Sequence, residues 1–297
     1  MFDRVSKFSY FFATEILNLI IKDDKKLFEI IYKFIHHEEI NWDDPKCLSE
    51  KINYRKIYQK NPLFSLCADK YRVRDYVKNH TQICKLIPLL GVYDSFDEID
   101  FSKFDCDVIL KTNHASSVVA IIKKGDEIDM KALKKQMDFA MSMDFGEFSR
   151  ESHYSKIPPK IIAEKLMTDE SGNIPNDIKI HCFYGEPKFI QIANPEHTTN
   201  DIFDLDWNRL DVIYRNEPSN NPMKKPKNLE QILKVSSELS NEFDYVRVDL
   251  YNLGDEIYFG ELTFTPNGGF AKILPREFDY EWGSYWDVKK SVQNQRC

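Results

Sequence analysis

The sequence predicts an α+β protein in which a helical N-terminal region precedes two parts that combine strands with helices. Three observations carry this prediction: apolar residues at helical spacing in residues 1–85, short β-branched runs in 86–167, and two alternating hairpins in 168–297. The order strand, loop, strand, helix, strand in the middle part differs from a repeating βαβ array, which favours α+β over α/β. The 297 residues suffice for one large domain or two smaller ones that share a cleft.

Composition excludes several classes of protein. The chain has 41 basic and 48 acidic residues, a net charge of −7, which gives no electrostatic basis for general nucleic-acid binding. Hydrophobic residues make up 42% of the chain, so intrinsic disorder is excluded as its main state. The six cysteines form no C-x-x-C pair and the histidines no H-x-x-x-H pair, so we expect reduced thiols in a cytoplasmic protein without a zinc site.

An apolar segment near the start, Phe8 to Ile21, bears on membrane association. Glu15 and Asn18 interrupt it and no small-residue cleavage site follows, so it is a poor signal peptide. No stretch reaches the roughly 18–20 apolar residues that a transmembrane helix needs. A helix packed on the core is the favoured interpretation, and a helix lying on a membrane surface is the alternative.

The helical region is expected to contain at least three helices. An apolar stripe at helical spacing marks the first, and it comprises Leu27, Ile30, Ile31, Phe34 and Ile35. Ser49 is the expected N-cap of a second helix, with Glu50 in its first turn. A third runs from Asp69 to Val77, where Lys70 and Arg74 share one face, which we expect to be solvated.

The middle part is expected to form strands at 107–111, 117–122 and 160–167 and a helix at 129–143. Lys111 ends a strand and leads into the small polar loop 112–117, where an ammonium and several donors could meet a phosphate. The P-loop pattern G-x-x-x-x-G-K-[ST] is absent, so an ordinary hairpin is the stronger interpretation of this segment alone. His114 is a candidate catalytic base, against the plainer interpretation of a loop histidine.

The last part contains two hairpins, a helix at 229–243 and a tail, Trp282 to Trp286, expected to pack back on the body. In the first hairpin, Asp177, Lys179 and His181 share one strand face, and polar-out alternation explains this without any function.

The second hairpin carries the strongest chemical signal. Alternation puts Arg247 and Asp249 on one face, and Glu261 on the returning strand is expected to share a face with Ile257 and Phe259 and to lie beside Asp249. Two carboxylates of this kind suit Mg²⁺, which leaves coordination sites for phosphate and water. A solvated hairpin face with one surface salt bridge is the alternative. The strand then enters a Pro-Asn-Gly-Gly turn, 266–269, whose backbone N–H groups can approach a ligand.

The ordered set of motifs resembles the TupA-like branch of the ATP-grasp superfamily, which takes its name from teichuronopeptide biosynthesis. The resemblance covers Asp69 to Asp279 and rests on the following segments, of which the last pair is the most specific: DKYRVRDYV (69–77), LIPLLGVY (86–93), ILKTNH (109–114), CFYGE (182–186), and VRVDLY (246–251) with FGELTFTP (259–266). It implies two α+β subdomains that clasp ATP between antiparallel sheets, in residues 86–167 and 168–297.

The resemblance also implies roles for individual residues. Lys111 would contact ATP phosphates beneath a covering loop that includes Ser116 and Ser117. The adenine would meet Glu164, Lys165 and Leu166, and the ribose or phosphates would meet Asp177 or Lys179. Magnesium would be held by Asp249 and Glu261, and Arg247 would contact phosphate or the reacting carboxylate. Two departures stand out: Thr263 replaces the usual asparagine, for which Asn267 could substitute, and the covering loop lacks glycine.

The expected function is that of an ATP-dependent carboxylate–amine ligase that forms an amide through an acyl phosphate. The resemblance suggests cell-surface polysaccharide or capsule biosynthesis, with an amino acid or amine joined to a uronic acid and contact with membrane-bound polysaccharide machinery. A kinase acting on a sugar hydroxyl, a non-catalytic partner module and a glycosyltransferase are the alternatives. The last would use the D-x-D triplet at Asp105–Asp107, although a turn at a strand edge explains that triplet better.

Overall fold

The computed structural model describes residues 17–18, 20–116 and 118–294. Most of the apolar segment Phe8 to Ile21, as well as Ser117 and Cys297, lies outside the described residues. None of the helices in the described part of the chain is both long and apolar enough to cross a bilayer. Cys47, Cys67, Cys84, Cys106 and Cys182 are free thiols, as predicted.

The helical region contains α2 (Asp24–His36), α3 (Leu48–Tyr58), α4 (Pro62–Ala68) and α5 (Val73–His80). Helix α2 starts where the Asp23 carboxylate accepts the Lys26 N–H at 3.1 Å. Its buried face is narrower than the predicted stripe: Leu27 and Ile31 are buried, but Ile30 and Phe34 are 44% and 67% exposed. The N-cap of α3 is Cys47, not Ser49; Ser49 lies inside the helix and bonds Asp279.

The middle part folds as a four-stranded antiparallel sheet in the order β2-β5-β3-β4. Its elements are β2 (Leu89–Tyr93), η1 (Phe96–Glu98), η2 (Phe101–Lys103), β3 (Val108–Thr112), β4 (Val119–Ile122), α6 (Met130–Ser142), α7 (Phe145–Ser149), η3 (Tyr154–Lys156) and β5 (Ile161–Lys165). Leu133 and Met137 of α6 pack on Val108, Leu110 and Ala163 of the sheet. The predicted strands and helix are therefore confirmed within a few residues.

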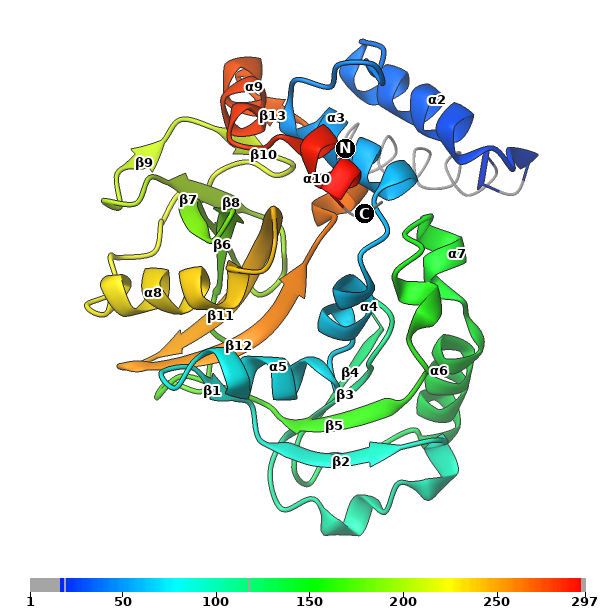
Figure 1. Cartoon of the computed structure of the whole chain (residues 1–297). Helices are drawn as coiled ribbons and strands as arrows, with labels where there is room; N and C mark the ends of the chain where they lie inside the picture. The colour runs from blue at the N-terminus through cyan, green and yellow to red at the C-terminus, as the bar shows by residue number, and fades with distance from the viewer. Residues whose placement is uncertain (1–16, 19, 117, 295–297) are drawn as a thin grey trace.

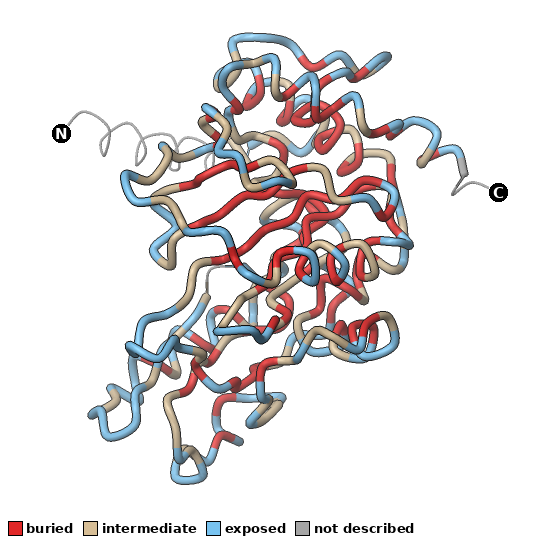
Figure 2. The backbone as a smooth tube through the Cα atoms, turned by 90° about the vertical axis from the view of Figure 1, so that its left-hand side faces the viewer, coloured by how far each residue is buried: buried red, intermediate tan, exposed pale blue. Residues whose placement is uncertain are grey.

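The larger sheet has the order β1-β12-β11-β6-β7-β8-β9. Its strands are β1 (Lys85–Leu86), β6 (Asp177–Phe183), β7 (Glu186–Ala193), β8 (Asn200–Phe203), β9 (Arg209–Leu210), β11 (Tyr245–Leu253) and β12 (Glu256–Thr263). Helix α8 (Leu229–Ser240) covers one face together with α4 and α5, and Figure 2 shows the buried residues running along these strands. In Figure 1, α5 lies between this sheet and the β2–β5 sheet.

The C-terminal segment closes the fold against the N-terminal helices. It contains η4 (Pro266–Gly269), β13 (Ile273–Leu274), which pairs with β10 (Ile213–Tyr214), then α9 (Arg276–Ser284) and α10 (Val288–Asn294). Trp282 and Trp286 are buried in one cluster with Leu48 and Ile52 of α3, so the predicted packing of the tail is confirmed. Figure 1 shows α9 and α10 beside α3.

Candidate active site between the two sheets

Three neighbouring strands of the larger sheet place Lys179, Asp249 and Glu261 in one row. Asp249 of β11 lies opposite Lys179 of β6 on one side and opposite Glu261 of β12 on the other. Residues directly opposite each other on antiparallel strands have Cβ atoms about 4.5–5.5 Å apart, so their side chains meet. The predicted juxtaposition of Asp249 and Glu261 is present in the structure.

A β-bulge at Gly260 brings this pair together, and it corrects one prediction. Ile257 and Phe259 are buried in the apolar core, whereas Glu261 lies on the opposite face with Asp249. The pairing shifts by one residue because Leu250 faces Phe259 and Asp249 faces Glu261, which leaves Gly260 as the extra residue. A Cβ at Gly260 would lie 2.9 Å from the carbonyl oxygen of Asp249, so glycine allows the close approach.

Arg247 is the centre of the hydrogen bonds on this face. It donates to both oxygens of Asp249, Nε to Oδ1 at 2.7 Å and Nη2 to Oδ2 at 2.6 Å, and to Thr263 Oγ1 at 3.0 Å. Thr263 in turn donates to Glu261 Oε1 at 2.8 Å. Lys179 Nζ donates to Asp249 Oδ2 at 3.0 Å and lies 3.3 Å from Asp177. Both oxygens of Asp249 are thus engaged, while the Glu261 side chain is 41% exposed.

The charges of this row make Glu261 the more acidic carboxyl. Desolvation alone would raise its pKa, but Lys70, Arg247 and Lys179 together lower the pKa of Glu261 to about 2. Burial raises the pKa of Asp249, with Arg247 and Lys179 opposing that effect. A half-buried carboxylate next to several cations is therefore ionised at neutral pH.

The polar face of β6 is buried and not solvated, contrary to the plain prediction. Asp177, Lys179 and His181 are all buried. His181 Nε2 lies 3.1 Å from Gln191 Oε1 and its Nδ1 lies 3.0 Å from the Tyr245 hydroxyl. Burial, and then the charge of Arg247, hold the pKa of His181 well below its usual range. This imidazole is therefore neutral, and its hydrogen bonds to Gln191 and Tyr245 give it a structural role next to the site.

A second cluster lies on the smaller sheet. Lys111 Nζ is 2.7 Å from Glu164 Oε2, and Arg74 Nη1 donates to Glu164 Oε1 at 3.2 Å. Arg74 also donates to the Ile87 carbonyl at 2.9 Å, where the chain passes from β1 to β2. Glu164 therefore holds a cation from the β3 strand end and one from α5, and its own carboxylate is buried.

Lys70 joins the two clusters, and the sequence interpretation missed it. Its ammonium donates to the Ala115 carbonyl at 2.9 Å, and its backbone N–H donates to the Asn113 carbonyl at 3.1 Å. Desolvation lowers the pKa of Lys70, with Glu261, Lys111 and Glu164 all in electrostatic reach. The expectation of a solvated face for Lys70 and Arg74 is wrong. The helix predicted from Asp69 begins only at Val73, so Lys70 lies in the turn before α5 and does not share a helical face with Arg74.

The other predicted site residues lie around these clusters. His114 is buried, with Nε2 3.2 Å from the Met143 carbonyl, and burial lowers the pKa of its ring. Ser116 is exposed at the end of the loop that Lys70 holds.

Two further predicted residues follow Glu164 where β5 ends. Lys165 is exposed and Leu166 is buried. Asn267 adopts φ 52° in the turn, and its Oδ1 accepts from Arg215 at 2.7 Å.

Asp107 of the D-x-D triplet makes its hydrogen bonds to residues outside these two clusters. Asp107 accepts the Lys124 N–H at 2.8 Å through its side chain and the Leu166 N–H at 2.9 Å through its carbonyl. It therefore stabilises the turn before β3, as the sequence favoured.

The carboxylates fit a magnesium ion that also binds a nucleotide. In the described part of the chain, no group of three or more His, Cys, Asp or Glu side chains could hold a metal by itself. Mg²⁺ commonly takes one or two carboxylates and completes its octahedron with phosphate oxygens and water. Asp249 and Glu261 are a pair of this chemistry: both Asp249 oxygens already accept from Arg247 or Lys179, and the half-buried Glu261 side chain has room for a further ligand.

The chain is remotely similar to several solved structures. The D-alanine–D-alanine ligase from Bacillus anthracis complexed with ATP is 14% identical, with a TM-score of 0.44, over 78% of this chain and 66% of that one. The Helicobacter pylori D-alanine–D-alanine ligase is 16% identical, with a TM-score of 0.39, over 77% and 57%. An ADP complex of purK, an N5-carboxyaminoimidazole ribonucleotide synthetase, is 11% identical, with a TM-score of 0.38, over 68% and 46%. The chain thus spans about two thirds or less of their length.

A family model gives the decisive comparison. No curated protein matches the sequence. The model of the TupA-like ATPgrasp family, however, matches residues 50–287, a span that contains both the Lys111 cluster and the Asp249 row. The chain belongs to the TupA-like ATP-grasp family and has its α+β fold.

Proposed function

We propose that this protein is an ATP-dependent carboxylate–amine ligase that forms an amide through an acyl phosphate. The observation that carries the proposal is the row on the larger sheet, where the exposed Glu261 and the buried Asp249 lie opposite each other beside Arg247. Family membership supports ATP as the co-substrate. The clasp would consist of residues 86–167 and 168–297, with Lys70 contributed by the turn before α5 and Arg74 by α5 itself.

ATP would bind between the two clusters. Its phosphates would meet Lys70 and Lys111 from one side and Lys179 from the other, because Lys70 lies within electrostatic reach of both Lys111 and Glu261, and Glu261 is also within reach of Lys179. Glu164, Lys165 and Leu166 would line the adenine end, with Asp177 near the ribose and the loop around Ser116 above the phosphates. Asp249 and Glu261 would hold Mg²⁺, which when bound offsets negative charge on the phosphates. Asn267 would join them only by releasing Arg215.

The chemistry consists of two displacements. A carboxylate oxygen of the substrate attacks the γ-phosphorus, the bond from that phosphorus to the β–γ bridging oxygen breaks, and ADP leaves. An amine nitrogen then attacks the acyl carbon, the carbon–oxygen bond to phosphate breaks, and the amine loses a proton. Arg247 and Lys111 stabilise the charge that develops on oxygen in both steps. His114 stays a predicted base for the amine proton.

The substrates follow from the family resemblance. We propose an amino acid or amine joined to a uronic acid of a cell-surface polysaccharide or its precursor, such as a capsule. The reaction would take place in the cytoplasm, with peripheral contact to membrane-bound polysaccharide machinery. No nucleic acid is involved, in keeping with the net charge of −7.

Hydroxylamine trapping tests the reaction without knowledge of the amine. The protein is incubated with Mg-ATP, pooled uronic acids and hydroxylamine, and the mixture is followed by phosphorus NMR and mass spectrometry. A ligase yields ADP, free phosphate and a hydroxamate that depends on the uronic acid. A new phosphate ester would instead establish a sugar kinase, and turnover of a nucleotide sugar in a parallel reaction would establish a glycosyltransferase.

A matched pair of variants links the outcome to the site. Glu261→Gln removes the exposed carboxylate of the row, whereas Glu256→Gln changes an exposed residue of the same strand that pairs with Lys85. Hydroxamate formation should vanish in the first and persist in the second. Equal activity in both variants would remove Glu261 from the mechanism.

A further inference from the structure

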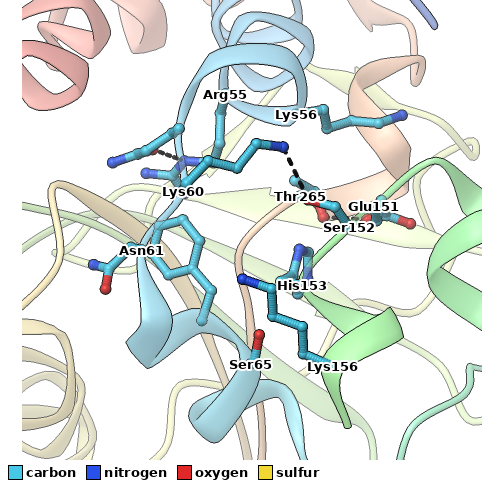
Figure 3. A pocket seen from close by; sticks show the side chains of 12 residues that line it. Arg55, Lys56, Lys60, Asn61, Ser65, Glu151, Ser152, His153, Lys156 and Thr265 are labelled. Atoms are coloured by element: carbon cyan, nitrogen blue, oxygen red, sulfur yellow. Dashed lines mark hydrogen bonds between the residues drawn. The ribbon is translucent and has the colours of Figure 1, made fainter. Parts of the chain in front are cut away.

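Arg215, which directly follows β10, is a cation that the proposed mechanism does not use. In the described part of the chain, every arginine except Arg72 and Arg215 forms an ion pair with a carboxylate. Arg55 is a typical paired case, since it lines the small polar cavity of Figure 3 and is neutralised by Asp244. Arg215 is exposed instead, and its Nη1 donates to the neutral Oδ1 of Asn267 at 2.7 Å. Its positive charge is therefore available to a ligand.

The backbone at Arg215 is held in a conformation that arginine rarely adopts. Its φ of 67° lies in the left-handed region, which is sparsely populated by residues other than glycine, asparagine and aspartate. The Arg215 N–H donates to the Lys272 carbonyl at 2.9 Å, and the next N–H, of Asn216, donates to the Tyr214 carbonyl at 2.8 Å. These bonds fix the direction in which the arginine side chain leaves the backbone. Strain of this kind concentrates at functional sites, so it is a second indication of a role for Arg215.

The residue before Arg215 places it on the polar face of the larger sheet. The centre of the Tyr214 ring lies 5.8 Å from that of His181, and His181 lies directly opposite Arg247 across β6 and β11. The alternate residues of these two strands point to the opposite face, where α8 covers the core. Arg215 therefore follows a side chain that packs next to Arg247, on the side of the sheet that carries the Asp249 row.

The hydrogen-bond partner of Arg215 approaches the same end of the row from another segment. Asn267 lies in the turn η4, shortly after Thr263 at the end of β12, and Thr263 Oγ1 accepts from Arg247 at 3.0 Å. Asn267 is partly exposed and the Glu261 side chain is 41% exposed. A molecule at the row can therefore meet Arg215 from solvent, without entering a closed cavity.

This end of the polar face is the one away from the proposed nucleotide. Asp177 and Lys179, assigned to the ribose and phosphates, precede His181 along β6, whereas Tyr214 and Arg215 lie beyond them on the His181 and Arg247 side. The amine must reach the acyl carbon from outside the nucleotide. In an α-amino acid the carboxylate is attached to the same carbon as the reacting nitrogen, so it lies close to the reaction centre when the nitrogen attacks.

We propose that Arg215 binds the carboxylate of an amino acid that serves as the amine, and that it thereby selects against amines without a carboxylate. The inference rests on the proposed function, since it takes the Asp249 row as the reaction centre. A planar guanidinium matches a carboxylate in a bidentate geometry. The bond to Asn267 engages Nη1 and orients the guanidinium, which leaves most of its N–H donors for the ligand.

Competition between two amines tests the proposal. The protein, Mg-ATP and the uronic acid that yields a hydroxamate are incubated with hydroxylamine and one L- or D-amino acid at a time, and mass spectrometry measures the ratio of amide to hydroxamate. Both nitrogens displace phosphate from the same acyl phosphate and lose a proton, so the ratio does not depend on how fast that intermediate forms. Replacing the active amino acid by its carboxamide should lower the ratio about 10-fold or more, because a hydrogen bond to a charged group is lost.

Variants at Arg215 locate the effect. Arg215→Gln should lower the ratio about 10-fold for the amino acid and leave the ratio for its carboxamide nearly unchanged. Arg215→Lys keeps the charge without the planar fork and should recover part of the loss. Glutamine and lysine meet the same left-handed backbone as arginine, so neither variant relieves the strain. Arg72→Gln is the matched control, because Arg72 is the other described arginine without an ion pair and is exposed in the turn before α5; its ratio should equal that of the wild type.

The outcomes separate this inference from the proposed function. A carboxamide that competes as well as the acid, a ratio that Arg215→Gln leaves unchanged or lowers equally for both, or a wild-type protein that forms the hydroxamate and joins no amino acid would each overturn the inference. A wild-type protein that forms no hydroxamate would instead overturn the proposed function. Calorimetric titration of the amino acids and their carboxamides into the wild type and Arg215→Gln, with a non-hydrolysable Mg-ATP analogue present, would then decide whether Arg215 binds a carboxylate.

Discussion

Two buried arginine–aspartate pairs flank the same strand, β11, and they differ in what surrounds them. Arg55 of α3 pairs with Asp244, just before the strand, and Arg247 within the strand pairs with Asp249. The two aspartate side chains are similarly buried, at 10% and 4% exposure. Burial and ion pairing alone therefore do not distinguish a structural pair from a candidate catalytic one.

The distinction lies in how completely each pair is satisfied. Arg55 also donates to the Tyr245 and Phe264 carbonyls at 2.8 and 2.9 Å, and its guanidinium lies 4.2 Å from the centre of the Trp286 ring. These contacts of Arg55 hold α3 and the tail to the sheet. Around Arg247, by contrast, the cation Lys179 and the half-open Glu261 leave charge that a ligand could use. A charged group that the network leaves partly exposed, here Glu261, is therefore what distinguishes the candidate catalytic pair.

The largest expected effect is a loss of stability when the fully satisfied pair, Arg55–Asp244, is broken. Arg55→Met leaves Asp244 buried without its main cation, which typically costs about 3–5 kcal/mol. Arg247→Met should cost less, about 1–2 kcal/mol, because Lys179 still bonds Asp249. Urea unfolding measures both free energies. Equal losses in the two variants would show that Lys179 does not compensate and that the two pairs are equivalent.

The second effect concerns activity and tests Glu261, the partly exposed carboxylate next to the Arg247–Asp249 pair. Glu261→Gln should reduce ATP-dependent turnover by on the order of 100-fold, because a charge that acts on the phosphates is lost. Its free energy of unfolding should fall by only about 1 kcal/mol, since the side chain is 41% exposed. Initial rates of ADP release, measured beside urea unfolding, check both. A variant that loses activity only in proportion to its unfolded fraction would make Glu261 structural.

The third effect concerns the cation that joins the two clusters. Lys70→Met should raise KM for ATP about 10-fold, equivalent to roughly 1.4 kcal/mol, and leave kcat nearly unchanged. Arg72→Met is the matched control, because Arg72 is exposed in the turn immediately before α5. If both variants behave like the wild type, then Lys70 only anchors the 112–116 loop and contacts no phosphate.

The sequence predicted most of the fold because the strands alternate clearly and are punctuated by turns. It also predicted the pairing of Asp249 with Glu261, although for an incomplete reason. Strict alternation put Glu261 with Phe259, and only the bulge at Gly260 places it on the polar face. A bulge depends on the partner strand, so periodicity within one segment does not reveal it. Lys70 and Arg74 were missed for a related reason: their partners are distant in the chain, the 113–115 segment for Lys70 and Glu164 of β5, 90 residues later, for Arg74.

The smallest effect is the pH dependence of the stability that Glu261 contributes. The pKa of Glu261 is about 2 in the folded protein, below its ordinary value of 4.5. A carboxyl whose pKa is lower in the folded than in the unfolded state stabilises the fold above the unfolded value and loses that contribution as pH falls toward the folded value. The stability advantage of the wild type over Glu261→Gln, about 1 kcal/mol at pH 6 after allowance for exposure, should therefore narrow below pH 4.5. Urea unfolding at pH 6.0, 4.5 and 3.5 measures it. A stability advantage that stays constant over this range would mean that the charges of Lys70, Arg247 and Lys179 do not stabilise the ionised Glu261. The difference between the Arg55–Asp244 pair and the Arg247–Asp249 pair would then rest on packing alone.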